Sequence, residues 1–292
     1  MCCPIHVRVD RGAQAQLMDP SRLSASLNFD PHTGIWSSNR AAKVAYPEGD
    51  HAACFGLEDA SFWFRHRNRA IVAAVRRHPP AGFILDIGGG NGFVARGLID
   101  AGFETVLLEP GADGARNAHR ARGIPDVICA SLDDAGIHDG VVPAAAMFDV
   151  IEHIEDDRAA AAEVHRLLQP GGLFYLTVPA FNWLWSGADV DALHFRRYSP
   201  ESMRAMLTAH FEIVYMTALF ARLVPAFFVA RTLPYAIGLR ARSGRQFKAE
   251  HQPGGAAGTA LLERVLAHEI MRIEKGRSLR WGSTLLVVAR RR

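Results

Sequence analysis

The stretch that decides the fold runs from Phe83 to Pro110 and reads FILDIGGGNGFVARGLIDAGFETVLLEP. An apolar run leads into four glycines within five residues, and the helix-like pattern that follows is closed by Gly102. A second apolar run then ends in Glu109. This order is typical of a buried β-strand, a tight turn, a helix and a second strand.

The same alternation of apolar runs and amphipathic segments continues along most of the chain after Glu58. The patterns predict strands at 82–87, 105–110, 126–132, 144–150, 173–180, 212–219 and 283–290, and helices at 58–78, 92–102, 111–123, 156–169 and 199–211. Continuous apolar strands separated by helices are typical of sheets that are covered on both faces. We therefore predict an α/β fold with a doubly wound, mostly parallel, seven-stranded sheet of Rossmann-like type, joined by right-handed crossovers.

The chain divides into three regions by this pattern. Residues 58–219 and 279–292 form the predicted core. Residues 1–57 mix turn formers with scattered aromatics, and we expect a partly ordered arm. Roughly 60 residues, 220–278, separate the last two strands, which is too many for an ordinary loop. They predict a helical and basic insertion that acts either as a lid or as a membrane-contact element.

The glycine turn lies where doubly wound sheets bind ligands, at the carboxyl end of a strand and the N-terminus of a helix. The dinucleotide fingerprint G-x-G-x-x-G is incomplete, because Phe93 takes the place of the third glycine. Asp86 is aimed at the turn, where a carboxylate repels a pyrophosphate and attracts a cation. Glu109 is placed to accept both hydroxyls of a ribose. We therefore expect a ligand with a ribose, a positive charge and no phosphate.

At these motifs the sequence resembles the class I S-adenosylmethionine (SAM)-dependent methyltransferases. The similar segments are LDIGGGNG, LLEP and FDVIEHIEDDRAAAAEVHRLLQPGGLFYLTVPA. The last of these looks like the fourth strand, connecting helix and fifth strand of the group that includes the ubiquinone-biosynthesis-type, type 11 and type 23 methyltransferases. The resemblance covers roughly residues 58–219 and the final strand, and it implies SAM as the cofactor.

The resemblance also implies which residues bind the cofactor. They come from the glycine turn, the strand ends and the preceding helix: Asp86, Gly88, Gly89, Gly90, Gly92, Glu109, Ser131, Leu132, Asp149 and Arg67. Asp86 and the glycine backbone would hold the methionine moiety, and Glu109 the ribose hydroxyls. Asp149 would lie beside the methionine end.

Two positions leave alternatives open. The family usually offers an acid or amide to the adenine where this chain has Ser131 and Leu132, so Asp133 or the backbone is a candidate contact. In the helix Phe62–Asn68, the aromatics could cover the cofactor while Arg67 pairs with its carboxylate or with Asp86. The alternative is a helix that packs its aromatics on the sheet and leaves its arginines in solvent.

The segment after the fifth predicted strand, residues 182–199, is expected beside the transferred methyl group. It reads NWLWSGADVDALHFRRYS. One interpretation is a substrate pocket in which Trp185 and Tyr198 contact an apolar body, Arg197 binds an anionic group and His194 is the general base. The other is a packed loop whose arginines and aspartates pair internally.

Glu152 and His153 follow the fourth predicted strand, where they could bind a metal or act as a base. A single Glu-His pair is a small ligand set for a metal, and we favour an architectural role. The four cysteines contain no C-x-x-C spacing. We therefore predict neither a metal site nor a disulfide framework.

The composition, 49% hydrophobic and 22% charged, is that of a soluble globular protein. No apolar run of about 18 residues predicts a transmembrane helix, and the N-terminus lacks the apolar segment of a secretory signal. We therefore expect a cytoplasmic protein. No pattern in the sequence indicates an oligomeric state.

Residues 219–292 contain 14 Lys and Arg but only 4 Asp and Glu, whereas the net charge of the whole chain is +3. This part is expected to meet an anionic partner. Residues 219–250 are apolar as well as basic, so they predict a lid or a peripheral contact with the inner face of a membrane. No nucleic-acid partner is predicted, because no N/D-P-P-Y/F-type tetrapeptide follows the fourth strand.

The sequence thus predicts methyl transfer from SAM to a small, partly apolar acceptor of anionic or lipid-like character. O-methylation is favoured because His194 could deprotonate a hydroxyl. One alternative is an NAD(P)-dependent oxidoreductase, which Phe93 and Asp86 oppose. The other is a non-catalytic SAM-fold module that binds a partner through its basic C-terminal part.

Overall fold

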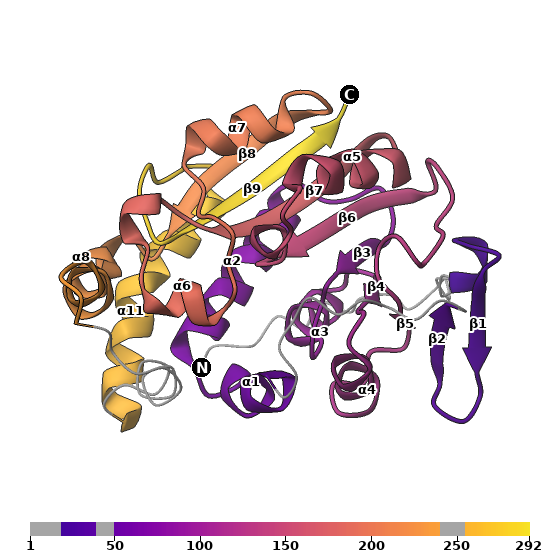
Figure 1. The fold of residues 1–292 in the computed structure, drawn as a ribbon, viewed down its shortest axis with the longest axis horizontal. Coiled ribbons are helices and arrows are strands. Elements are labelled where there is room, and N and C mark those ends of the chain that lie inside the picture. The colour runs from indigo at the N-terminus through magenta and orange to yellow at the C-terminus, as the bar shows by residue number, and fades with distance from the viewer. Residues whose placement is uncertain (1–18, 39–49, 240–254) are drawn as a thin grey trace, which may run out of the picture.

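A computed structural model describes residues 19–38, 50–239 and 255–292. They form one nine-stranded sheet with helices packed around it (Figure 1). The strands lie in the order β1-β2-β5-β4-β3-β6-β7-β9-β8. Their bounds are β1 Leu27–Asp30, β2 Ile35–Ser38, β3 Ile84–Ile87, β4 Thr105–Leu108, β5 Val127–Cys129, β6 Val142–Phe148, β7 Leu168–Pro179, β8 Phe211–Leu219 and β9 Thr284–Arg291.

The predicted α/β fold is confirmed, and its seven strands are β3 to β9. Strands β3 to β7 pair in parallel, while β9 runs antiparallel between β7 and β8. Strands β4 and β5 lie on one side of β3, and β6 and β7 lie on the other. The carboxyl end of β3 is therefore the point where the strand order reverses, which is where such sheets bind ligands.

The N-terminal arm corrects the predicted strand count, because it adds a hairpin to the sheet. Strands β1 and β2 are antiparallel, and β2 pairs in parallel with β5. The Asp30 carboxylate accepts the His32 N–H and the Thr33 hydroxyl, which closes the turn between the strands. Gly34 completes it with φ +75°. Residues 1–18 and 39–49 of the predicted arm lie outside the described residues.

The helices lie on both faces of the sheet. Their bounds are α1 Asp50–Glu58, α2 Phe62–Arg77, α3 Phe93–Asp100, α4 Ala112–Arg120, α5 Asp157–Leu167, α6 Gly187–Asp191, α7 Pro200–Leu207, α8 Val224–Phe227, α9 Leu233–Ala236 and α11 Gly255–Glu274. The helix predicted over 58–78 is broken before Ser61, whose hydroxyl caps α2 by accepting the Trp63 N–H.

Three apolar clusters hold the helices on the sheet, and the smallest packs α4 against β4 and β5 through Ala115 and Ala118. Helices α5 and α7 pack on one face through residues such as Val164 and Met203. Helices α2, α3 and α11 pack on the other, with Ile71, Val94 and Ile273 among the buried side chains. Since both faces are covered, only the strand ends are left to form a site.

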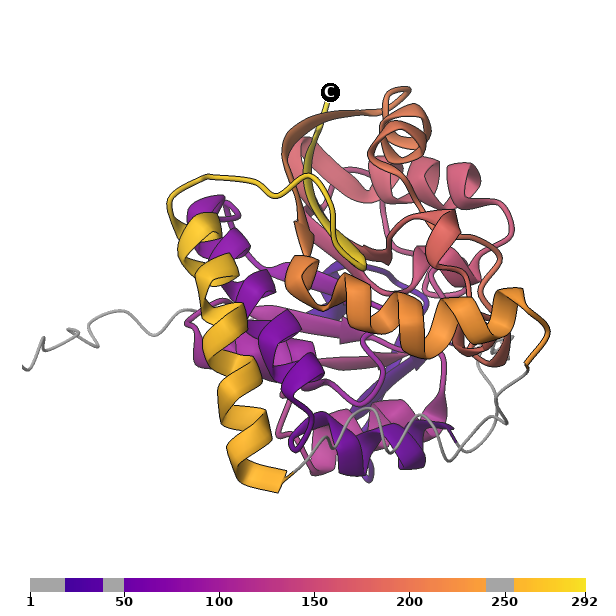
Figure 2. The same cartoon turned by 90° about the vertical axis from the view of Figure 1, so that its left-hand side faces the viewer.

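The insertion after β8 has two described parts. α8, a π-helical turn at Phe228–Thr232 and α9 form one helical segment, while α11 runs alongside α2 (Figure 2). The buried Glu269 of α11 joins them, since it accepts the backbone N–H groups of Phe220 and Ala221 and lies 2.9 Å from His66 Nε2.

Two sequence-based expectations concern this insertion. The predicted basic stretch, 240–248, lies outside the described residues. Within the described part of the chain, none of the helices combines the length and the apolar character that crossing a membrane requires.

Candidate active site

The glycine turn at the end of β3 has the open backbone that the sequence predicts. Gly88, Gly90 and Gly92 have φ values of +69°, +55° and +79°, a region that L side chains rarely adopt. A Cβ on Gly89 would come within 2.8 Å of Asp86 Oδ2. The turn therefore needs glycine for its conformation and for the close approach of the neighbouring carboxylate.

Asp86 lies in β3 just before the turn and is 1% exposed. Its Oδ2 atom has no hydrogen-bond partner among the described residues. Burial and the nearby Glu109 raise the pKa of Asp86 to about 7, against the opposing charge of Arg67. A cationic ligand at this position would favour the ionised carboxylate.

Glu109 directly follows β4 and faces the same turn. Its Oε2 accepts the Gly90 N–H at 2.8 Å, and its Oε1 accepts the Gly111 N–H at 2.7 Å. A carboxylate offers about four lone-pair positions. These two bonds therefore fix the side chain and still leave it able to accept hydroxyl groups of a ligand.

Arg67 of α2 forms an ion pair with Asp149, the residue after β6. Its guanidinium carbon lies 4.6 Å from the centre of the Trp63 ring and 5.4 Å from that of Phe64. Burial lowers the pKa of Arg67 to about 10, although Glu152 acts the other way. The sequence left two partners open for Arg67, the cofactor carboxylate and Asp86. Asp86 affects the pKa of Arg67 only through its charge, whereas the ion pair of Arg67 is with Asp149.

The residues that follow β5 face a cavity that the glycine turn and Glu109 also line. Ser131, Leu132 and Asp133 all line it. The Ser131 hydroxyl donates to Asp134 Oδ2 at 2.7 Å, so its proton is already used within the loop. The adenine contact is therefore left, as before, to Asp133 or to the backbone.

Of the predicted cofactor residues, all except Gly92 line one cavity of about 1330 Å³. This is larger than the roughly 300–1,000 Å³ of a typical small-molecule site, so it has room for a cofactor and an acceptor together. From the insertion, Phe227, Arg231, Tyr235 and Leu239 contribute to its wall. These four residues were not predicted from the sequence, because no local pattern shows which face of a helical insertion turns inward.

His194 lies on the cavity wall and is held by a buried carboxylate. Its Nδ1 lies 3.0 Å from Asp189 Oδ1, which also accepts from Arg197 Nε at 2.7 Å. The backbone N–H of Ser186 donates to the other oxygen of Asp189. Burial acts to raise the pKa of Asp189, but the hydrogen bond from His194 and the charge of Arg197 outweigh it and lower the pKa.

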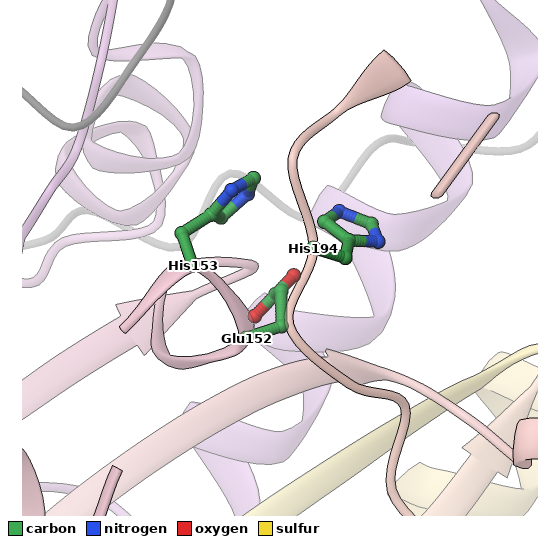
Figure 3. Close-up of side chains that lie close together, drawn as sticks. All are labelled: Glu152, His153 and His194. Atoms are coloured by element: carbon green, nitrogen blue, oxygen red, sulfur yellow. The ribbon is translucent and has the colours of Figure 1, made fainter. Parts of the chain in front are cut away.

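Glu152 and His153 lie beside His194 (Figure 3). The His153 and His194 ring centres are 4.8 Å apart. Burial raises the pKa of Glu152 to about 8, although Arg67 and Arg197 oppose the shift. Burial, and then the proximity of His194, lower the pKa of His153 to about 4. Near neutral pH Glu152 and His153 therefore carry little charge.

The predicted acceptor residues are brought together only in part. His194 and Arg197 line the cavity, but Trp185 and Tyr198 are absent from its wall. Tyr198 is 2% exposed in the apolar cluster under α5 and α7, and its hydroxyl donates to Asp157 Oδ2. Tyr198 is therefore buried away from the cavity, whereas Trp185 is partly buried and does not line the cavity wall. The ion pair between Arg197 and Asp189 agrees with the other interpretation of this loop, a packed segment whose arginines and aspartates pair internally.

The chain is similar to known methyltransferases over its central part. Residues 85–176 match the family model described as methyltransferase domain. A probable S-adenosylmethionine-dependent methyltransferase of Mycolicibacterium smegmatis is 28% identical over 163 residues, which are 54% of this chain and 62% of that protein. An uncharacterised methyltransferase of Mycobacterium bovis is 30% identical over 125 residues, 42% of this chain and 49% of that one. The chain thus spans about half to three fifths of these relatives.

Solved structures share the fold. A SAM-dependent methyltransferase of Thermotoga maritima has a TM-score of 0.51 at 16% identity, with 82% of this chain and 94% of that chain covered. A chain in the complex of the Haloferax volcanii Trm112 methyltransferase activator has a TM-score of 0.53 at 16% identity, covering 83% and 94%. Residues 85–176 thus match a methyltransferase domain, the relatives that align over this region are named as methyltransferases, and the solved structures share the fold.

Proposed function

We propose that the protein transfers a methyl group from SAM to a hydroxyl oxygen of a small, partly apolar acceptor. The observation that carries this proposal is the single cavity that joins the carboxylates of Asp86 and Glu109 to the imidazole of His194. A donor at the glycine turn and an acceptor at His194 would share this cavity. Most of the rate then comes from alignment and the exclusion of water.

The cofactor side supports a cationic nucleoside. The ammonium and sulfonium groups of SAM would add positive charge beside the buried Asp86, whose Oδ2 has no hydrogen-bond partner among the described residues, and Glu109 would accept the ribose hydroxyls. Arg67 is paired with Asp149 and lies against the Trp63 ring. These contacts hold both charged side chains in place next to the expected position of the methionine moiety. A pyrophosphate in the same place would face both carboxylates.

The acceptor side supports activation of a hydroxyl group. Asp189 fixes Nδ1 of His194, which leaves Nε2 as the nitrogen that can accept a proton. In the transfer, the acceptor oxygen forms a bond to the methyl carbon as the carbon–sulfur bond breaks. The hydroxyl proton goes to His194, and S-adenosylhomocysteine leaves as a neutral thioether.

The insertion supports an acceptor that is partly apolar and anionic. Phe227, Tyr235 and Leu239 give the cavity an apolar wall, and Arg231 adds a positive charge. The outer side of the same segment exposes Val229 and Ile237, which are 64% and 62% exposed. We therefore include peripheral membrane contact, through which a lipid-like acceptor reaches the cavity, in the proposal.

Calorimetric titration of the purified protein with SAM and, separately, with NAD tests the cofactor. We expect SAM to bind with one site per chain and NAD to give no heat. Binding of NAD without SAM would overturn the proposal in favour of an oxidoreductase.

Incubation with methyl-labelled SAM and a cell extract tests the reaction. We expect label in a small organic-soluble product that contains a methyl ether. A protein that binds SAM but transfers no label from it is a binding module and not an enzyme. Label on nitrogen or carbon would retain methyl transfer and reject the hydroxyl acceptor.

A further inference from the structure

Glu152, His153 and His194 form a cluster that the sequence did not assemble. In the described part of the chain it is the one group in which three metal-ligating side chains have donor atoms within 4.8 Å of one another. Figure 3 shows the side chains converging from two segments, the turn after β6 and the loop that precedes α7. All three line the large cavity.

The Glu152 carboxylate is the first sign that the cluster holds a ligand. The residue is 0% exposed, and neither of its carboxylate oxygens has a hydrogen-bond partner among the described residues. Leaving such a group buried and unpaired is costly. The neighbouring guanidinium groups do not pair with it, since Arg67 is bonded to Asp149 and Arg197 to Asp189.

The two imidazoles are oriented as metal ligands commonly are. A metal-bound histidine usually has its second ring nitrogen fixed by a carboxylate or a backbone carbonyl. Here Asp189 holds Nδ1 of His194, and His153 has a hydrogen bond with the backbone of Ala192. Asp189 is itself held by Ser186 and Arg197, so the support beyond the cluster is rigid.

We propose that Glu152, His153 and His194 bind one divalent transition-metal ion, with Zn²⁺ as the reference ion. Two imidazoles and one carboxylate make a ligand set that suits zinc and leaves a position open, whereas Mg²⁺ prefers oxygen ligands alone. Ligand atoms about 2.1 Å from a tetrahedral zinc ion are roughly 3.4 Å apart. The donor atoms lie within 4.8 Å of one another, so binding the ion would require side-chain rotations that bring them closer.

The functional consequence of this site rests on the proposed function. The open position faces the cavity in which the acceptor would lie. A hydroxyl bound there would have its pKa lowered by the ion, which activates it for methyl transfer. His194 would then serve as a ligand, and the proton would leave to solvent instead of to its Nε2.

The test is calorimetric titration of the full chain with Zn²⁺, after metal has been removed with a chelator and the chelator dialysed away. We expect one ion per chain. Glu152→Gln and His153→Ala should each weaken binding by at least about 100-fold, since removal of a ligand costs more than the 10–100-fold that follows loss of an outer partner. Asp189→Asn removes an outer partner of His194, so it should weaken zinc binding by about 10–100-fold.

The chain offers a matched control. His165 and His210 form a second pair whose ring centres are 4.9 Å apart, and they do not belong to a three-ligand group within the described residues. His165→Ala should leave zinc binding unchanged. If wild type and Glu152→Gln bind zinc equally, or His165→Ala abolishes binding, the proposal is overturned.

Two further measurements keep the result interpretable. Co²⁺ in place of zinc should give the visible absorption of a four- or five-coordinate nitrogen and oxygen site, and Glu152→Gln should lose it. A spectrum equal to that of hydrated Co²⁺ contradicts the site. SAM titration of the metal-free protein and the labelled-methyl assay are independent of it. Failure of the metal proposal leaves SAM binding intact, whereas failure of the proposed function appears as absence of SAM binding or of methyl transfer to a hydroxyl group.

Discussion

The cofactor side and the acceptor side of the cavity are built in different ways. Asp86, the glycine turn and Glu109 belong to one continuous strand–turn–helix–strand unit, and sheet pairing and backbone hydrogen bonds hold them in place. His194, Glu152 and Tyr235 come from three segments that meet only in the folded chain. The first side can be changed one residue at a time, whereas the second depends on how distant segments pack.

Removal of the His194 side chain should have the largest effect and should separate the two sides most clearly. We expect His194→Ala to lower turnover by roughly 10²–10⁴-fold, the range for a lost acid–base group. The affinity for SAM should stay unchanged, because His194 lies at the acceptor end. Single-turnover kinetics with labelled SAM and calorimetry measure the two quantities, and full turnover in the variant would reject His194 as the activating group.

Removal of the Asp86 side chain should have the opposite signature. Loss of one partner of a buried charge pair costs about 2–5 kcal/mol, so the Kd for SAM in Asp86→Ala should rise at least about 30-fold. Asp126 is a suitable control, because burial raises its pKa to about 6 and it does not line the cavity. A variant Asp126→Ala with the same loss of SAM affinity would show that Asp86 acts through the fold alone.

The pH dependence of SAM binding tests the charge on the cofactor side. Burial and Glu109 raise the pKa of Asp86 to about 7, against Arg67, so the carboxylate is protonated below that pH. A cation binds the ionised form, and SAM affinity should therefore fall about tenfold from pH 8 to pH 6. The measurement uses chelator-treated protein, and Asp86→Asn should be insensitive to pH in this window. An unchanged wild-type affinity would contradict a cation held by Asp86.

The outer face of the insertion should give the smallest effect. Ile237→Glu places a charge on its exposed apolar side and should reduce association with anionic vesicles several-fold, without changing SAM affinity. Met271→Glu, at a residue of α11 that is 49% exposed, is the matched control. Binding of the wild type should weaken with salt. Equal vesicle association of both variants, or none in the wild type, would leave the insertion as a lid only.

The cofactor side could be predicted from the sequence because its information is local. The run of glycines, Asp86 before it and Glu109 at the next strand end specify both the turn and the residues around it. The same reasoning missed the β1–β2 hairpin, whose strands have only four residues each and show weak alternation. Short strands of this kind depend on the sheet edge that they join.

The acceptor side could be predicted only as a region. Residue types in the loop indicated a site, and His194 lies on the cavity wall, but the pattern could not show which way Trp185 and Tyr198 turn. Glu152 and His153 formed too small a ligand set by themselves. Their third partner, His194, is far along the sequence, and no spacing rule connects the two segments.

The buried Glu269 has a consequence for exchanging parts between relatives. Its carboxylate binds the backbone at the start of the insertion and lies against His66 in the helix that also carries Arg67. In a chimaera with a foreign insertion, the residue at position 269 comes from the donor protein, whereas His66 comes from the host. The two side chains of this buried contact then no longer come from the same protein. Acceptor specificity can be transplanted in this fold only if the graft includes position 66 together with the insertion.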